Sequence, residues 1–294
     1  MARRSSALAL VRSSSMGSQH TIARAVHRHG IGLHTGQESK VTLHPAPPHT
    51  GRVFRRGEAN LPATVAVAIP SQLSTLLTHG ELTVRTPEHL LSALAGLEID
   101  NVWIDLEGPE IPILDGSALP WVNAILEAGR INQSIPKTIR PITQPITIWE
   151  GDAFVSAIPS PEVRLTYGIE FDSAAIGTQW VSWSPSVDGY IAAIAPARTF
   201  TLAKYLEPLR AAGLIQGGSL NNAIVCDDQH WLNPPLRFEL EPCRHKLLDL
   251  IGDLSLLGAL PQGHIVAYKA SHTLHSKFAQ AVQLQCPPVV DNRQ

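Results

Sequence analysis

Cysteine is scarce in this sequence of 294 residues, with only Cys226, Cys243 and Cys286, and no pair has CxxC or a similar metal-type spacing. This odd, scattered set argues against a disulfide framework and favours a reducing compartment with buried thiols. Long apolar runs are missing as well. The longest, from Leu247 to Leu260, is interrupted by two aspartates and a glycine, whereas a membrane span needs about 20 apolar residues. The sequence therefore predicts no transmembrane segment.

An excess of charge of either sign is also absent. The 23 Lys and Arg residues nearly balance the 25 Asp and Glu residues, and the formal net charge is -2. An RNA-associated domain would need a basic stripe and stacking aromatic residues, but aromatic residues make up only 5% of this chain. Hydrophobic residues account for 44%, which is typical of a globular protein. We therefore expect a folded protein with no nucleic-acid partner.

The N-terminal segment differs from the rest of the chain. No acidic residue occurs between Met1 and Gln37, and residues 1–18 are rich in Ser and Arg. A transit peptide for an organelle has this composition. An unstructured leader, or a segment that results from a start codon assigned upstream of Met16, would look the same. We interpret residues 1–18 as a disordered leader and keep the transit peptide as the alternative.

The order of the expected elements indicates two similar α+β domains. Residues 129–145, with Gly129 and three prolines, form the best candidate linker between an N-terminal domain at 19–128 and a C-terminal domain at 146–285, followed by a tail at 286–294. In each domain we expect a mainly antiparallel sheet packed with helices in two layers, and an active site between the domains. The expected strands lie near 21–26, 40–43, 63–69, 101–106, 146–158, 163–171, 223–227 and 264–269, and the expected helices near 86–96, 121–128, 201–212, 241–257 and 276–284.

Two of the expected helices carry pairs of residues that could perform chemistry. Thr86-Pro87 predicts a helix start, with Thr86 as N-cap, and places Glu88 and His89 in the first turn. His89 could ligate a metal while Glu88 accepts a proton, although a capping Glu followed by an incidental His is the more common case. In the second helix, His245 and Asp249 are four residues apart.

That spacing places His245 and Asp249 on one face of the helix, where both can bind one metal ion. Asp253 continues the same row. A solvated polar face is the alternative interpretation. His272 follows the strand-like run at 265–269, where it could act as an acid or base or be an ordinary loop histidine.

Together these residues form a specific inventory. Two His and one Asp make a zinc set that leaves a coordination position open for water. One Glu and one further His remain for proton transfer, so the set suits metal-assisted hydrolysis. By contrast, His27, His29 and His34 have no Cys or carboxylate among them, and we interpret them as surface or turn histidines rather than a metal cluster.

From about residue 20 to about residue 285 the sequence resembles the zinc-dependent UDP-3-O-acyl-N-acetylglucosamine deacetylases. Seven motifs occur in the order of that family. They are Gly30-Ile31-Gly32-Leu33-His34-Thr35-Gly36, Arg85-Thr86-Pro87-Glu88-His89-Leu90-Leu91-Ser92-Ala93-Leu94, Glu110-Ile111-Pro112-Ile113-Leu114-Asp115-Gly116-Ser117, Ala197-Arg198-Thr199-Phe200, Gly217-Gly218-Ser219, Arg244-His245-Lys246-Leu247-Leu248-Asp249 continuing through Gly252-Asp253-Leu254, and His272 with Leu274.

The resemblance implies a hydrolase that removes the N-acetyl group of UDP-3-O-acyl-N-acetylglucosamine in the committed step of lipid A biosynthesis. It implies one Zn²⁺ per chain, although iron could also occupy a site of two His and one Asp. It also implies a bacterial cytoplasmic enzyme, with an organelle as the alternative location, and we expect a monomer. The implied zinc ligands are His89, His245 and Asp249. The implied general base is Glu88, and the implied acid is His272, which Asp253 is implied to orient. Lys246 and Thr199 are implied to stabilise the oxyanion.

The acyl chain of such a substrate needs an apolar passage, and the family places its acyl-binding insert after residue 200. We expect the passage to be lined by Phe200, Leu202, Leu206 and Leu214, whereas a core-facing amphipathic helix is the alternative. The family usually carries Gly where this chain has Ser271 and Asn where it has His275, and it often carries His where this chain has Ser173. Another metal-dependent amidase and a non-catalytic sugar-nucleotide or acyl binder are the remaining alternatives.

Overall fold

Two five-stranded sheets with the same strand order dominate the computed structural model, which describes residues 17–233 and 235–290. In each sheet all neighbouring strands are antiparallel except one parallel pair, β9 with β4 in the first sheet and β19 with β14 in the second. The first sheet contains β2 (Val26–Ile31), β3 (Glu38–Pro45), β9 (Val102–Glu107), β4 (Arg52–Arg56) and β5 (Ala59–Pro62). The second contains β12 (Ile146–Glu150), β13 (Ala153–Ile158), β19 (His264–Tyr268), β14 (Arg164–Glu170) and β15 (Thr178–Trp183). The expectation of two similar α+β domains is confirmed.

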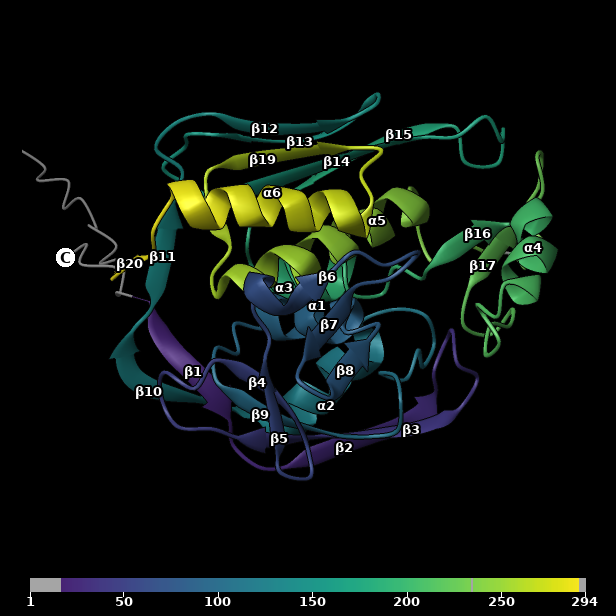
Figure 1. Cartoon of the computed structure of the whole chain (residues 1–294). Helices are drawn as coiled ribbons and strands as arrows, with labels where there is room; N and C mark the ends of the chain where they lie inside the picture. Colours follow the sequence, from purple (N-terminus) through teal and green to yellow (C-terminus); the bar gives the residue numbers. More distant parts are fainter. Residues whose placement is uncertain (1–16, 234, 291–294) are drawn as a thin grey trace, which may run out of the picture.

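The helices lie between the two sheets, which form the outer layers at the top and bottom of Figure 1. The first half contributes α1 (Glu88–Gly96) and α2 (Leu119–Ala128), and the second contributes α5 (Glu241–Leu254) and α6 (His272–Gln285). At the centre, α1 packs directly against α5. Side chains such as Leu94 and Ile251 are fully buried there, and burial of each stabilises the fold by about 1.5–3 kcal/mol.

Each half carries an insertion at the same topological position, between the fourth strand of its sheet in chain order, β5 or β15, and its first central helix, α1 or α5. In the first half the insertion contains η1 (Val65–Val67), β6 (Ala68–Ile69), β7 (Leu76–His79) and β8 (Leu82–Arg85). In the second half it contains α3 (Val187–Ala193), β16 (Phe200–Leu202), η2 (Ala203–Tyr205), α4 (Leu206–Ala211) and β17 (Ile224–Cys226). The β16, α4 and β17 part projects from one side of the molecule (Figure 1).

Short strands near each end of the chain pair with the segment that lies between the two sheets in the sequence. β1 (Ser18–Ile22) pairs with β10 (Arg130–Pro136), and β11 (Thr138–Pro141) pairs with both β18 (Pro261–Gln262) and β20 (Val289–Val290). The segment 129–145, expected as a linker, thus contains two paired strands. The expected leader lies outside the described residues apart from its last two. The domain limits at 19–128 and 146–285 stay a prediction.

Several local expectations were wrong. Thr86 does not cap α1, because its φ is 58° and its hydroxyl donates instead to the buried carboxylate of Glu110 at 2.6 Å. The segment expected as a helix at 201–212 begins as β16, continues as the short helix η2 and becomes α-helical only at Leu206. Within the strand expected at 63–69, Val65–Val67 form the short helix η1, and only Ala68–Ile69 are a strand. α5 continues into η3 (Ser255–Leu257). Among the described residues no helix is long and apolar enough to cross a membrane.

The contact between α1 and α5 depends on Gly252. A Cβ atom at this position would lie 2.2 Å from the carbonyl oxygen of Glu88, far closer than real Cβ contacts. We expect Gly252→Ala to push the helices apart and to lower the free energy of unfolding by about 1–3 kcal/mol. Urea denaturation measures this change. Gly17→Ala is the control, since its methyl group would meet only the flexible Lys137 side chain at 3.4 Å, and equal stability of both variants would contradict the close contact.

Candidate metal and active site

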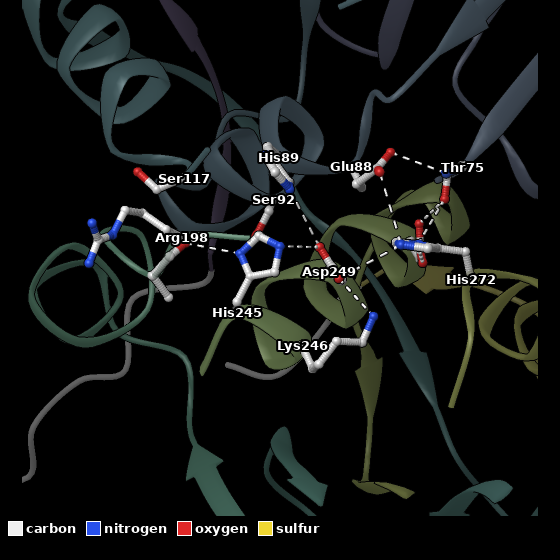
Figure 2. Close-up of polar contacts among 12 residues, drawn as sticks. Thr75, Glu88, His89, Ser92, Ser117, Arg198, His245, Lys246, Asp249 and His272 are labelled. Carbon is white, nitrogen blue, oxygen red and sulfur yellow. Dashed lines mark hydrogen bonds and ion pairs between the residues drawn. The ribbon is translucent and has the colours of Figure 1, made fainter. Parts of the chain in front are cut away.

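Three buried side chains from the two central helices converge on one point. His89 comes from the first turn of α1, and His245 and Asp249 come from successive turns of α5. The Oδ1 atom of Asp249 lies 3.6 Å from Nε2 of His89 and 3.4 Å from Nε2 of His245. Figure 2 shows both imidazole rings directed at this carboxylate. The structure thus brings together the three residues expected as metal ligands.

The chemistry of these donors fits a metal ion. The buried Oδ1 atom of Asp249 has no hydrogen-bond partner. Nδ1 of His245 lies 3.0 Å from the carbonyl oxygen of Ala197, which can only accept, so Nδ1 carries the proton and Nε2 presents its lone pair. Burial lowers the pKa of His245 to about 4, which keeps the ring neutral. Neutral imidazole nitrogens and an unpaired carboxylate oxygen are the ligands that a structural or catalytic divalent metal takes.

Lys246 holds the other oxygen of the Asp249 carboxylate. Its Nζ donates to Oδ2 at 2.9 Å. Burial opposes the Lys246 cation, but the negative charge of Asp249 outweighs this effect and raises the pKa of Lys246. Burial likewise opposes ionisation of Asp249, yet Lys246 and His245 hold the pKa of this carboxyl well below its usual range. Both groups are therefore charged at neutral pH.

Glu88 lies beside the cluster with a perturbed pKa. Burial of its carboxyl raises the pKa to about 7, although the neighbouring His272 and His89 rings pull it down. The backbone N–H of Thr75 donates to Oε2 of Glu88 at 3.3 Å, and Nε2 of His272 lies 4.0 Å from Oε1. A carboxyl with a pKa near the working pH is suited to accept and release a proton.

His272 begins α6 and is oriented by Asp253. Its Nδ1 donates to Oδ2 of Asp253 at 2.7 Å, and the Thr75 hydroxyl donates to Oδ1 of the same carboxylate. Burial opposes the His272 cation, but Asp253 outweighs it and raises the pKa of the ring to about 9. Burial opposes ionisation of Asp253, but the neighbouring His272 and His275 outweigh this effect and lower the pKa of its carboxyl. At neutral pH His272 therefore carries a proton that it can donate.

A cavity of about 620 Å³ opens onto these polar groups. His245, Lys246, Asp249 and His272 line one part of it, together with Thr199. The rest of the wall is mainly apolar. It includes Phe200, Leu202 and Leu206 as expected, but not Leu214, and it also includes Leu33, Leu73, Phe171, Leu209, Ile215, Leu220, Val225 and Leu232.

A buried carboxylate paired with Arg198 fixes the segment that carries Thr199 and Phe200. Glu241, the first residue of α5, is fully buried, and its carboxylate accepts hydrogen bonds from the backbone and guanidinium of Arg198. The Thr199 N–H donates to the carbonyl oxygen of Gly116 at 2.8 Å. Gly116 has a φ of 84°, and a Cβ there would lie 2.0 Å from the Asn222 carbonyl oxygen. Only glycine fits at this turn.

His34 lies in a turn, one of the two settings expected for it, and Thr75 was overlooked. His27 and His29 are exposed on β2, but His34 is buried, lines the cavity, and has no hydrogen-bond partner at either ring nitrogen. Burial lowers the pKa of His34, so the ring is neutral. Its place within the motif at 30–36 is the signal that could have identified it. Thr75 lies in no such motif.

The remaining departures from the family pattern have structural explanations. Ser271 caps α6, because its hydroxyl accepts the Leu274 N–H at 3.1 Å. Ser173 is buried, and its hydroxyl donates to the Asp227 carbonyl oxygen at 3.0 Å. Cys226 and Cys243 are buried free thiols, as expected.

Comparison with known proteins agrees with this site. A family model described as "LpxC: UDP-3-O-acyl N-acetylglycosamine deacetylase" matches residues 19–283. A UDP-3-O-acyl-N-acetylglucosamine deacetylase of Nostoc sp. is 50% identical over 273 residues, which cover 90% of this chain and 98% of that protein.

Further relatives come from another cyanobacterium and from a plant. The protein of the same name from Thermosynechococcus vestitus is 52% identical over 91% of this chain and 95% of its own length. A protein of Arabidopsis thaliana named probable UDP-3-O-acyl-N-acetylglucosamine deacetylase 1, mitochondrial, is 46% identical over 89% of this chain and 87% of its own length. The chain therefore belongs to the LpxC family of UDP-3-O-acyl N-acetylglycosamine deacetylases.

Proposed function

We propose that this chain is a zinc-dependent hydrolase that converts UDP-3-O-acyl-N-acetylglucosamine and water to UDP-3-O-acyl-glucosamine and acetate, the committed step of lipid A biosynthesis. One observation carries the proposal: the unpartnered Oδ1 atom of Asp249 lies between two imidazole nitrogens at the wall of a largely apolar cavity. Such a site combines metal ligands with space for an acyl chain. The names of the relatives agree with this reaction.

In this proposal His89, His245 and Asp249 hold one Zn²⁺ ion. When bound, the ion supplies a Lewis acid that lowers the pKa of water and polarises the acetamide carbonyl group. The residues around the ligands prepare for that role. Lys246 fixes the Asp249 carboxylate, and the Ala197 carbonyl fixes the tautomer of His245.

Two proton transfers complete the reaction. The ionised Glu88 accepts a proton as a water oxygen attacks the acetamide carbon. The Lys246 cation and the Thr199 hydroxyl stabilise the negative charge that develops on the carbonyl oxygen, and such donors are typically worth about 3 kcal/mol each. The carbon–nitrogen bond then breaks, and His272, oriented by Asp253, donates its proton to the departing nitrogen. The products are acetate and the free amine.

Acetate release from UDP-3-O-acyl-N-acetylglucosamine tests the proposal. We expect the metal-loaded chain to release acetate from this substrate and to be much slower on UDP-N-acetylglucosamine, which lacks the acyl chain that the cavity would bind. Absence of release from folded, metal-loaded protein would favour another metal-dependent amidase or a non-catalytic binder.

The apolar wall of the cavity is the proposed passage for the acyl chain. Phe200, Leu202 and Leu206 lie on β16 and α4, within the insertion that projects from the second half. The cavity volume of about 620 Å³ is typical of a site for a ligand of this size.

Leu206→Asp is expected to raise KM for a substrate with a long acyl chain by about tenfold or more, because a charged side chain then replaces part of the apolar cavity wall. KM for a short-chain analogue should change little. Leu284, which is 86% exposed on α6, offers the control variant Leu284→Asp. Equal KM changes for long and short chains would contradict the passage.

We further propose that the chain acts as a monomer, because α1, α5, α6 and the segment before β16 of one chain supply every group that this mechanism uses. Bacterial cytoplasm is the proposed location, with an organelle as the alternative if residues 1–18 are a transit peptide. The relatives include cyanobacterial proteins, which agree with a bacterial origin, and a plant protein named mitochondrial, which agrees with the alternative.

A further inference from the structure

A second histidine binds the carboxylate that orients His272. His275 lies one turn after His272 on α6, and its Nδ1 is 2.7 Å from Oδ2 of Asp253, the same oxygen that accepts from His272. An ionised carboxylate can only accept, so Nδ1 of His275 carries a proton. The Thr75 hydroxyl donates to Oδ1, so the Asp253 carboxylate accepts three side-chain hydrogen bonds, two from α6 and one from the loop before β7.

His275 is itself anchored on its far side. Its ring is fully buried, and Nε2 lies 3.2 Å from the hydroxyl oxygen of Tyr167 on β14. That hydroxyl donates to the carbonyl oxygen of Ala270 at 2.6 Å, just before the residues that begin α6. The ring of His275 therefore connects the loop before α6, the sheet and α5, and it cannot rotate without breaking these contacts.

We propose that His275 is a positioning residue for the reaction: it fixes Asp253 so that His272 presents Nε2 toward Glu88 and Asp249. His275 does not line the cavity. It acts on His272 through Asp253 and through the edge-on contact between the two rings, whose centroids are 5.8 Å apart. This inference rests on the proposed function. It also gives a role to a departure from the family pattern, since the family usually carries Asn at this position.

Two variants with similarly polar side chains distinguish this positioning role from a role in packing alone. The carboxamide of Asn overlays the Nδ1 side of the imidazole ring, so His275→Asn keeps a donor for Asp253. The carboxamide of Gln overlays the Nε2 side, so His275→Gln keeps the contact with Tyr167 and loses the donor. We expect the Gln variant to lower kcat by about 10–100-fold and the Asn variant to stay within about threefold of the parent chain, with KM unchanged in both.

Equal kcat values for the two variants, or an effect confined to KM, would overturn the proposal. A second measurement does not depend on catalysis. In metal-free protein labelled with ¹⁵N-histidine, we expect two strongly deshielded ring N–H protons, from His272 and His275, and His275→Asn should remove one and shift the other. A single such proton in the parent chain would overturn the shared hydrogen bonds. A parent chain that shows both protons but releases no acetate would contradict the proposed function instead.

Discussion

Removal of the metal, or of one ligand, is expected to abolish acetate release. His245→Ala leaves only His89 and Asp249 to bind the ion, and two ligands do not hold zinc in a catalytic site. Loss of the ion removes several kcal/mol of transition-state stabilisation, so the rate should fall by about 1,000-fold or more, both in the variant and in the parent chain treated with a chelator. The measurements are acetate release and metal content by elemental analysis.

His27→Ala is the matched control, because His27 is an exposed histidine on β2 and should leave both measurements unchanged. Return of Zn²⁺ or of Fe²⁺ to the chelated parent chain tests which ion restores the rate, and neither ion should restore His245→Ala. Full activity in protein that contains no metal would contradict the ligand set and the hydrolytic mechanism built on it.

The sequence predicted those parts of the site whose geometry is local. His245 and Asp249 lie on one helical face because they are four residues apart, and the structure brings them into the same cluster. Asp253 continues that row and reaches His272. The helix that carries Glu88 was also predictable, because Pro87 and an acidic first turn favour a start there.

Contacts between distant segments could not be predicted in this way. His89 meets Asp249 only because α1 and α5 pack together, and no pattern along the chain encodes that pairing. The same holds for Thr75, which contacts Glu88 and Asp253 from the loop before β7. The residue types suggested a shared metal set, and the resemblance to a known family implied it, but neither predicts the contact between the two helices.

Thr86 shows how tertiary contacts override a local rule. Its position before Pro87 is typical of an N-cap, but the buried carboxylate of Glu110 also accepts from the His34 and Thr35 N–H groups, and Thr86 completes this set. The hydrogen bonds around a buried charge outweigh one helix cap, which contributes about 1 kcal/mol. The two sheets give a similar lesson, since one strand order arises twice from sequences without a visible repeat.

Replacement of Glu88 is expected to have the second large effect. Glu88→Gln keeps the size of the side chain but cannot accept the proton of the attacking water, so kcat should fall by about 100- to 10,000-fold. The parent chain should show a bell-shaped dependence of kcat/KM on pH. Activity rises as Glu88 ionises, through a pKa of about 7, and falls as His272 loses its proton, through a pKa of about 9.

The two limbs of this profile distinguish the roles of the two residues. The residual activity of Glu88→Gln should lose the acidic limb and keep the alkaline one, whereas His272→Gln should lose the alkaline limb, because only the protonated ring can donate to the departing nitrogen. A bound cation beside Glu88 lowers its pKa, so the acidic limb of the metal-loaded enzyme should lie at or below about pH 7. Loss of only the alkaline limb in Glu88→Gln would reverse the assignment, making Glu88 the acid and leaving His272 to act as the base.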